Sequence, residues 1–395
     1  MPATRQLLLV ACAFAATAAD PGVAAAERLP VVSIETPARI VDEPKRSARL
    51  RIHSGRTVFR GRVGIEVRGQ ASQRFAKRPY AFETRTKGGG NRSVELLGLP
   101  RGNDWILAAA HTDPSLMRDV LAYRAARRLG RYASRTRYVT LRLNGQGRGV
   151  YVLMEQLRRD RDRVDADALL ELTSAAKLDR GDEAFGLPAT GLFARVADAS
   201  QKAGTASVGA AAQAFERALY GGGPWRELLD VPAAVDYVLL QELFKNQDAF
   251  LSSTYVHRGK DLRLRLGPVW DFDLSAGNVS VSEFASAEGW LLTDRPWAER
   301  LYRAPDFVAA MRARWTQLRR DGLVEDLLAA AERDGRALRG PAAANHRRWR
   351  ILGRALFAGQ PVASSHGAAV SSLRAWLLRR AAWMDTALPT LEPPA

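Results

Sequence analysis

Cysteine is almost absent from this chain of 395 residues, because its one cysteine is Cys12, near the N-terminus. A lone thiol cannot form an intramolecular disulfide, and cleavage after residue 26 would leave the chain without any thiol chemistry. The five histidines, at positions 53, 111, 257, 346 and 366, lack the spacing of zinc ligands. There is also no Gly-x-Ser-x-Gly motif, so the nucleophile elbow of serine hydrolases is excluded.

Lysine is scarce as well, since only seven of the 59 basic residues are lysines and the other 52 are arginines. The formal net charge of +17 favours acidic partners such as phosphates. The arginines are scattered along the chain rather than gathered in blocks, which is typical of a general arginine bias. We therefore expect no nucleic-acid partner, and the 47% of hydrophobic residues predicts a well-filled core.

The N-terminus has the pattern of a secretory signal peptide. Met1 and Arg5 begin a short positive segment, an alanine-rich apolar stretch follows, and residues 24–26 are alanines suited to cleavage. We predict a signal peptide over residues 1–26 and a secreted or periplasmic mature protein. The apolar stretch before Cys12 is short for a lipoprotein signal, so we do not expect a lipid anchor. No transmembrane span is expected.

The first half of the mature chain has the alternation that is typical of strands. Strands are expected at residues 31–34, 48–52, 63–68 and 80–84. Asn144 and Gly145 predict a hairpin between strands 138–143 and 149–154. Asp113 followed by Pro114 predicts the capped start of a helix over residues 115–129.

The second half is expected to be mainly helical, with helices over residues 210–220, 231–246 and most of 297–391. A strand is expected at residues 169–173 and a second hairpin at 254–266, whereas residues 174–206 are expected to form a polar excursion. The outline is an α+β chain with two lobes, a strand-rich N-lobe over residues 27–157 and a helix-rich C-lobe over residues 158–395.

The segment 267–278 carries the most informative pattern, because Asp271 and Asp273 lie two residues apart in an apolar run. In a strand they would share one face. Two buried carboxylates side by side are costly unless a cation pairs with them. A divalent cation that carries phosphates would satisfy both. A strand would also hold the two acids about 6–7 Å apart along its axis, an awkward geometry for a facing pair of glycosidase carboxylates.

Four further features could complete a phosphoryl-transfer site. The turn at residues 68–72 has small residues for close approach to phosphates, with Arg68 and Ser72 as added contacts, although it could be an ordinary hairpin end. Lys77 could hold phosphates as a point charge or be a solvated lysine. Residues 153–157 resemble a hinge that meets an adenine, and Glu155 there could instead pair with Lys77 or Arg68. Asp248 ends a helix and could orient a hydroxyl nucleophile.

Taken in order, these segments resemble the CotH kinase family, the spore-coat type of atypical protein kinase. The similarity rests on residues 66–72, 77–80, 104–107, 113–119, 144–155, 246–248 and 267–273, and it covers about residues 60–320. The resemblance implies a divergent, two-lobed, protein-kinase-like fold that uses ATP with Mg²⁺ or Mn²⁺. The implied partner is a protein substrate with serine or threonine.

Carried over by motif, the resemblance makes Lys77 a phosphate contact, Asp248 the catalytic-loop aspartate and Asp271 a metal ligand with Asp273 beside it. One position departs from the pattern: Ser253 stands where a kinase has a metal-binding asparagine, and we predict that its hydroxyl oxygen serves as a metal ligand instead. Two other functions stay open at this point. One is a weakly active or inactive surface module that binds an anionic polymer or a protein. The other is a carbohydrate-active hydrolase that uses the acidic cluster.

Overall fold

The N-terminal strands close into a barrel. Its seven strands follow the order β1-β2-β3-β4-β7-β9-β8, and the parallel pairing of β1 with β8 closes the ring, whereas all the other neighbours are antiparallel. The strands are β1 (Val31–Glu35), β2 (Arg46–Ser54), β3 (Thr57–Val67), β4 (Tyr80–Arg85), β7 (Asp104–Ala108), β8 (Thr136–Leu143) and β9 (Gln146–Glu155).

The computed structural model describes residues 29–197 and 204–392. The predicted signal peptide and Cys12 lie outside these residues.

The barrel alternates buried and exposed positions, as a closed sheet with one packed face requires. Val32 and Ile34 of β1 and Leu50 and Ile52 of β2 point into its core, and Arg49 and Arg51, which alternate with the buried residues of β2, face solvent. The strand predictions for this half are confirmed, but closure was not predicted, because single strands carry no signal for the pairing of the first strand with β8. A small hairpin of β5 (Val94–Leu96) and β6 (Leu99–Gly102) lies beside the barrel.

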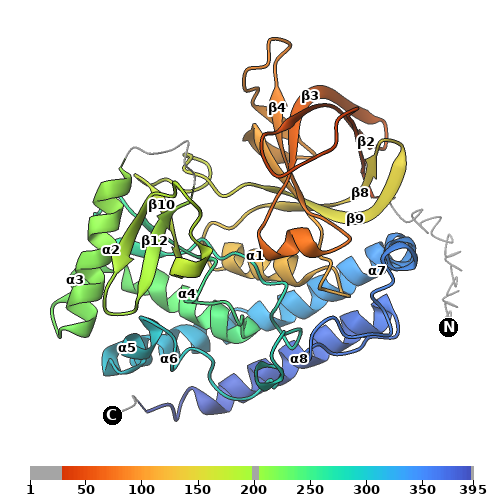
Figure 1. Cartoon of the computed structure of the whole chain (residues 1–395). Helices are drawn as coiled ribbons and strands as arrows, with labels where there is room; N and C mark the ends of the chain where they lie inside the picture. The colour runs from red at the N-terminus through yellow and green to blue at the C-terminus, as the bar shows by residue number, and fades with distance from the viewer. Residues whose placement is uncertain (1–28, 198–203, 393–395) are drawn as a thin grey trace, which may run out of the picture.

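The rest of the chain combines a five-stranded sheet with helices, so the α+β class is confirmed (Figure 1). The sheet has the order β11-β12-β10-β13-β14. Its strands are β10 (Leu169–Thr173), β11 (Ala184–Leu187), β12 (Leu192–Val196), β13 (Thr254–Arg258) and β14 (Leu264–Leu266). The helices are α1 (Arg118–Arg128), α2 (Thr205–Tyr220), α3 (Trp225–Leu228), α4 (Val231–Phe244), α5 (Ala298–Tyr302), α6 (Pro305–Arg320), α7 (Leu323–Trp349) and α8 (His366–Ala387).

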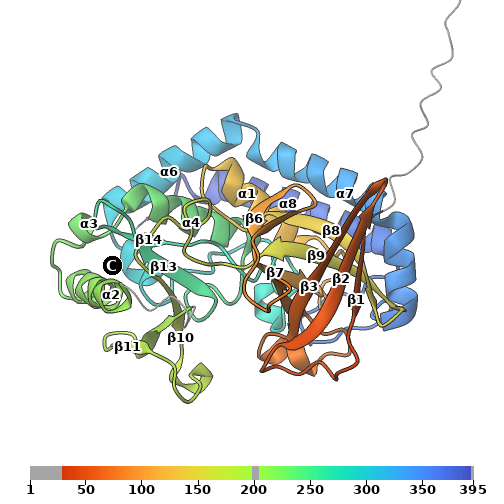
Figure 2. The same cartoon turned by 90° about the horizontal axis from the view of Figure 1, so that it is seen from above.

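Figure 2 shows the barrel at one side of the molecule, with α7 running past it and the sheet and shorter helices beyond. Helix α1 belongs to the first half of the sequence but packs in space with α4 and α7. Its alanines and Tyr123 join one large core with residues of the later helices. The barrel has a second core of its own. None of the helices in the part of the chain that the structure covers has the length and apolarity needed to cross a bilayer.

Three sequence-based expectations need correction. The excursion at residues 174–206 contains β11 and β12, which hold short alternating segments that the polar composition concealed; β12 pairs with β10, and β11 pairs with β12. Helix α1 begins at Arg118, because Asp113 accepts hydrogen bonds from the backbone amides of Ser115, Met117 and Arg118 in a turn before the helix. The segment with Asp271 is not a strand.

Gly149 is the point at which the barrel meets α7. It has φ of +84°, and a Cβ there would approach Asn345 Oδ1 of α7 to 2.4 Å and the Asn345 Cα to 3.2 Å. Asn345 Oδ1 accepts a hydrogen bond of 3.2 Å from the neighbouring Val150 amide. Only glycine lets this strand and this helix approach so closely.

We expect Gly149→Ala to destabilise the fold by about 2 kcal/mol or more, because it combines a left-handed backbone with a steric clash. Urea unfolding monitored by tryptophan fluorescence measures the change. Gly147→Ala is the matched control, since a Cβ at Gly147 meets no atom within 4 Å. Equal stabilities for the two variants would contradict this account of the contact.

Candidate active site

Four aspartates gather where the barrel meets the helical part. Asp119 comes from α1, Asp248 follows α4, and Asp271 and Asp273 follow β14. The charge of Asp271 raises the pKa of each of the other three, which places Asp271 among them. The sequence order had suggested that Asp248 and Asp271 meet, and the structure brings them together.

Asp271 lies in a turn that neighbouring residues hold in place. Its φ is +61°, in the left-handed region, which is uncommon for residues other than glycine. The next amide, Phe272 N, donates to Asp119 Oδ1 at 2.7 Å, and Asp271 N donates to the Tyr123 hydroxyl at 3.3 Å. Asp119 and Tyr123 lie one turn apart on α1, so this helix shapes the turn.

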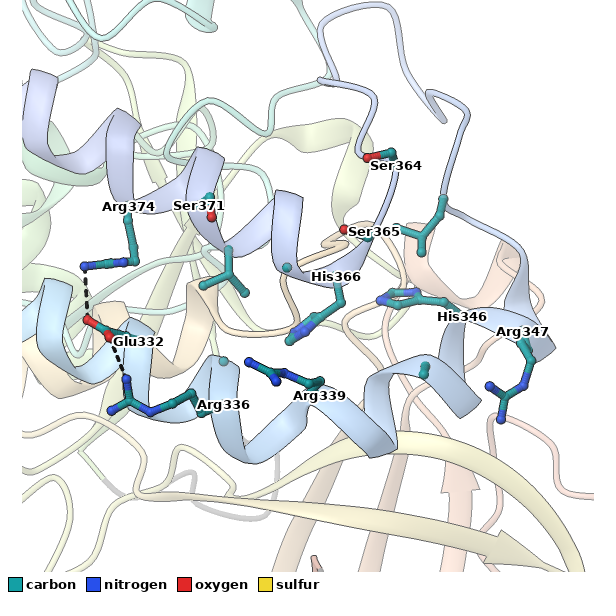
Figure 3. A pocket seen from close by; sticks show the side chains of 15 residues that line it. Glu332, Arg336, Arg339, His346, Arg347, Ser364, Ser365, His366, Ser371 and Arg374 are labelled. Atoms are coloured by element: carbon teal, nitrogen blue, oxygen red, sulfur yellow. Dashed lines mark hydrogen bonds and ion pairs between the residues drawn. The ribbon is translucent and has the colours of Figure 1, made fainter. Parts of the chain in front are cut away.

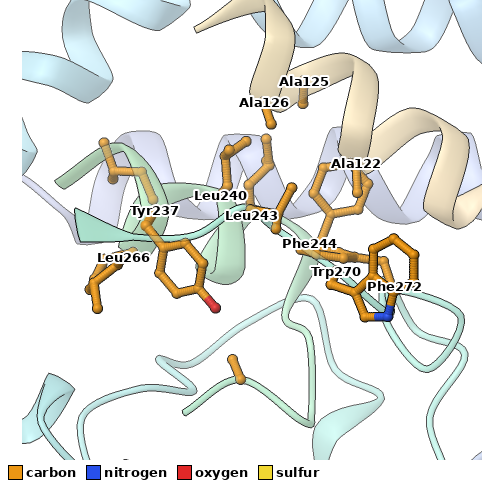
Figure 4. Packing of buried hydrophobic residues seen from close by; sticks show 14 of the residues in the cluster. Ala122, Ala125, Ala126, Tyr237, Leu240, Leu243, Phe244, Leu266, Trp270 and Phe272 are labelled. Carbon is orange, nitrogen blue, oxygen red and sulfur yellow. The ribbon is translucent and has the colours of Figure 1, made fainter. Parts of the chain in front are cut away.

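Apolar side chains on both sides of Asp271 anchor the turn between α1 and α4 (Figure 4). Trp270 stacks on Tyr123 with ring centroids 5.8 Å apart, and Phe272 meets Phe244 of α4 edge to face at 5.5 Å. Trp270 and Phe272 are both buried, and their spacing of two residues is the spacing of side chains on one face of a strand. An irregular apolar segment that packs between two helices therefore has the same composition as a buried strand. This explains why a strand was wrongly predicted here.

Asp273 is held from a different side. The Thr112 hydroxyl donates to Asp273 Oδ2, and the Asn278 amide group donates to the carbonyl oxygens of Asp273 and of Thr112. Gln360, from the segment before α8, donates to Asn278 Oδ1 at 2.9 Å. These buried amides fix Asp273 beside the barrel-proximal residue Thr112.

The start of α1 is joined to the same loop by a buried ion pair. Arg118 pairs with Asp113, and both side chains are almost completely buried. Arg118 Nε also donates to the carbonyl of Ser275 at 2.9 Å, and its Nη2 donates to the carbonyl of Ala276. Burial opposes ionisation of Asp113, but Arg118 and the hydrogen bonds from Ser115 lower its pKa overall. This pair orients α1, and through it Asp119.

Asp248 lies in a turn at the end of α4. Lys245 ends that helix in the left-handed conformation, and its ammonium donates to the carbonyls of Ser286 and Glu288. Asn246 Oδ1 accepts from the Asp248 amide at 3.3 Å, and the Gln247 side chain exchanges hydrogen bonds with Ser280. The backbone that carries Asp248 is therefore fixed by the chain that follows the Asp271 turn.

Ser253 reaches the cluster directly. Its hydroxyl donates to Asp271 Oδ2 at 3.1 Å, and its φ of +52° is a conformation that asparagine adopts more readily than serine. Its amide donates to Glu171 Oε1 at 3.2 Å. The predicted metal ligand Ser253 thus lies beside Asp271, with an oxygen available.

Burial and repulsion between carboxylates raise the pKa values of Asp119, Asp248 and Asp273. Burial and then the charge of Asp271 raise the pKa of Asp119 to about 7 and that of Asp248 to about 6. Burial, Asp271 and Asp119 raise the pKa of Asp273 well above its ordinary range, although the Thr112 hydrogen bond opposes this. Such a concentration of perturbed acids is typical of a functional site.

We expect Asp248→Asn to stabilise the fold at pH 8 by about 1–3 kcal/mol and to have little effect at pH 4. The raised pKa of Asp248, about 6 against an ordinary value of 3.8, means that ionisation costs stability as the pH rises through this window. Asparagine does not ionise and avoids that cost. Thermal unfolding at both pH values measures the difference. A stabilisation of equal size at pH 4 would show that the charge is not its cause.

Basic side chains border the cluster. The Arg68 guanidinium lies 5.5 Å from the centroid of the Trp270 ring, so the turn after β3 reaches the Asp271 segment. Lys177 and Arg295 lower the pKa of Asp248 against the larger effect of burial. Gln70 of the same turn donates to the Lys177 carbonyl at 3.1 Å. Cations from both halves of the molecule therefore surround these acids, as an anionic ligand would require.

Ser72 belongs to the same turn as Arg68. It lies in a short 3-10 helix over Ala71–Arg74. Gly69 has φ of +86°, and a Cβ there would come within 2.1 Å of the Ser72 hydroxyl. The turn is therefore tight and needs glycine at this place, as the expected phosphate-binding turn does.

Lys77 and Glu155 lie away from the acids, among other partners. Lys77 is buried, and its ammonium donates to the Val150 carbonyl at 2.5 Å and lies 4.8 Å from the Tyr151 ring centroid. Burial lowers its pKa to about 7, and Asp113 opposes this. Glu155 pairs with Arg135 and Arg163, so the suggested pairing with Lys77 or Arg68 is wrong. The nucleotide contacts of Lys77 and Glu155 stay predictions.

The residues fit a divalent cation only if a ligand completes its shell. Within residues 29–197 and 204–392 no three or more His, Cys, Asp or Glu side chains are grouped as a metal cage. Mg²⁺, however, is usually held by one or two carboxylates together with phosphates and water. Asp271, Asp273 and the Ser253 hydroxyl supply hard oxygen ligands of this kind, and a cation would relieve the repulsion among the acids.

Sequence reasoning missed Asp119 as a site residue. It belongs to the motif at residues 113–119, but nothing in a helical pattern shows that its carboxylate accepts from Phe272 N in a segment 153 residues later. The motif itself was the available signal, since Asp113, Arg118 and Asp119 are three charged groups that α1 would have to bury or bind.

Comparison with known proteins identifies one family. A family model described as CotH kinase protein matches residues 65–384, which include the acids, the Arg68 turn and most of the helical part. The search of curated proteins found no match.

Proposed function

Because the chain belongs to the CotH kinase protein family, we propose that it is an atypical protein kinase that transfers the γ-phosphoryl group of ATP to serine or threonine. We further propose that the barrel takes the part of a kinase N-lobe and the helical half that of a C-lobe. The observation that carries the proposal is the convergence of Asp248, Asp271 and Ser253, in which the Ser253 hydroxyl donates to Asp271. Two acids from separate segments at one place are what metal-assisted phosphoryl transfer requires.

In this proposal Asp248 accepts the proton of the substrate hydroxyl while the oxygen of that hydroxyl attacks the γ-phosphorus. The bond from the γ-phosphorus to the bridging oxygen breaks, and ADP leaves with that electron pair. With a pKa of about 6, Asp248 is mostly ionised at neutral pH and is more basic than an ordinary carboxylate, so it can take the proton. Asp271, Asp273 and Ser253 would hold Mg²⁺ or Mn²⁺, which neutralises phosphate charge when it is bound.

Binding and orientation fall to the basic residues in this proposal. Arg68 and the Gly69–Ser72 turn would contact phosphate oxygens from the barrel side, and Lys177 and Arg295 would add charge near Asp248. Lys77 would contact phosphates only if the nucleotide reached its buried ammonium. The proposed setting is the periplasm or the exterior, following the predicted signal peptide.

The test is transfer of label from γ-labelled ATP, with Mn²⁺ or Mg²⁺, to the mature protein itself and to a serine-rich acceptor. Metal-dependent label on serine or threonine is the expected result. Absence of transfer together with absence of ATP binding would contradict the proposal.

Serine at position 253 supports a second candidate, an inactive module of the same fold. A hydroxyl is a weaker metal ligand than the amide oxygen of asparagine, so turnover could be lost while binding persists. Ser253→Asn separates the two functions. Transfer that rises in this variant supports an active site that the serine limits, whereas wild-type ATP binding without transfer in either protein supports the binding module.

A further inference from the structure

A cavity lies away from the acids, in a groove between α7 and α8 (Figure 3). Its volume is about 770 Å³. Residues at intervals of three and four along α7 form one wall, from Glu332 to Arg347, and the first turns of α8 form the other. The groove is therefore one continuous surface between two long helices.

Its rim is basic. Four arginines border it: Arg336, Arg339, Arg347 and Arg374. Glu332 pairs with Arg336 and with Arg374, and so joins the two helices at one end of the groove. No ion pair or hydrogen bond of Arg339 or Arg347 was found within the described ranges, and both side chains are exposed. The guanidinium groups of Arg339 and Arg347 are thus unpaired among the described residues.

The interior of the groove is mixed rather than uniformly charged. Val370, Leu352 and Ala343 supply apolar surface, and Ser364 and Ser371 supply hydroxyls. Figure 3 shows the imidazoles of His346 and His366 in the space between the helices, and their centroids are 6.1 Å apart. Nδ1 of His346 is buried without a hydrogen-bond partner in the part of the chain described.

We propose that this groove binds an acidic segment of a protein, in extended conformation. The unpaired Arg339 and Arg347 attract carboxylates of the peptide. The apolar interior of the groove accepts the peptide side chains that lie between those carboxylates. A nucleic acid fits less well, because Glu332 would face its continuous row of phosphates and the lining contains no Phe, Tyr or Trp on which bases could stack. The partner is therefore a peptide with separated acidic residues.

The spacing of the arginines sets the spacing of those acids. Arg339 and Arg347 are eight residues apart on α7, which corresponds to about 12 Å along a helix axis at 1.5 Å per residue. An extended peptide covers about 13 Å over four residues, and residues i and i+4 point to the same side. The preferred segment has acidic residues at i and i+4 with an apolar residue between them.

The groove is also joined to the start of α1. His346 Nε2 lies 3.2 Å from the Pro114 carbonyl oxygen, and His366 Nε2 lies 3.1 Å from that of Ser115. These residues adjoin Asp113, which pairs with Arg118 next to Asp119. The two histidines of the groove therefore contact the segment that leads into α1, the helix that shapes the Asp271 turn, although binding itself requires no catalysis.

Fluorescence anisotropy with the mature full chain and two labelled peptides tests the proposal. The first peptide, Gly-Glu-Ala-Leu-Ala-Glu-Gly, has its acids at i and i+4. The second, Gly-Glu-Glu-Ala-Leu-Ala-Gly, has the same composition with adjacent acids. We expect the first to bind at least about fivefold more tightly.

Arg339→Ala with Arg347→Ala should weaken binding of the first peptide at least about tenfold. Arg320→Ala with Arg333→Ala removes the same charge from exposed positions of α6 and α7 outside the groove lining and should change it less than about twofold. Arg339→Glu with Arg347→Glu should instead favour a peptide with lysines in place of the glutamates. Asp271→Ala should bind like the wild type, which separates this result from the kinase proposal.

Equal weakening by the two alanine pairs would overturn the proposal, and so would equal affinity for the two acidic peptides. Displacement of the peptide by an RNA oligonucleotide at lower concentration than by unlabelled peptide would point to nucleic acid and also overturn it.

Discussion

Asp271→Ala is expected to abolish the stabilisation that ATP and Mn²⁺ give to the wild-type protein and to lower phosphoryl transfer at least about a hundredfold. At a ligand concentration of 100 times Kd, the wild type should gain about 2.7 kcal/mol of stability. The variant should gain almost none, because Asp271 is the acid that neighbours Asp119, Asp248 and Asp273 and accepts from Ser253. Its loss removes the central oxygen ligand of the proposed site.

Thermal shift with ATP and Mn²⁺ measures the first effect, and label transfer from ATP measures the second. Asp321→Ala is a suitable control, since it removes an exposed carboxylate between α6 and α7. The unliganded Asp271→Ala protein should be at least as stable as the wild type, because the repulsion within the cluster is reduced. A wild-type response to ATP in this variant would exclude Asp271 as a metal ligand.

Glu242→Ala is expected to have the largest effect on stability, about 3–5 kcal/mol, because it leaves the Arg380 charge unpaired in the core. Glu242 and Arg380 have no exposed side-chain surface, and Nη2 of Arg380 donates to Glu242 Oε2 at 2.7 Å. The same carboxylate accepts from the amides of Leu291 and Leu292 and from the Tyr302 hydroxyl. One residue thus joins α4, α8 and the chain before α5.

Denaturant unfolding of Glu242→Ala, of Arg380→Met and of the double variant tests this. The double variant should lose clearly less than the sum of the single losses, because removal of both charges leaves no unpaired ion. Arg336→Ala provides the contrast, since it breaks an exposed pair with Glu332 and should cost less than about 0.5 kcal/mol. Strict additivity in the double variant would mean that the two charges do not interact.

Local patterns predicted the secondary structure well where the signal was itself local. The Asn144-Gly145 turn has φ of +48° and +76°, which are the values that a two-residue hairpin needs, and β8 and β9 pair across it. The strand at residues 169–173 was predicted with its observed bounds. Alternation and turn residues act within a few positions of the chain, so they can be read from it directly.

The Asp271 segment shows where such patterns fail. A run of buried apolar residues is typical of a strand, yet residues 269–272 form an irregular segment between α1 and α4, because Tyr123, Phe244 and Asp119 hold it there. These partners come from helices that are distant in sequence. A propensity for strand was overridden by tertiary packing.

The sequence by itself determined the acids, their order and the family resemblance, because residue types and motif spacing are properties of the chain. It also determined the α+β class through alternating and helical periodicities. Only the tertiary structure decided that β1 closes a barrel with β8, that Asp119 joins the acids, that Glu155 pairs with arginines, and that α7 and α8 enclose a basic groove. Each of these depends on contacts between segments far apart in sequence. Such contacts form when apolar packing and the pairing of buried charges are satisfied together, and neither segment alone carries a pattern that predicts them.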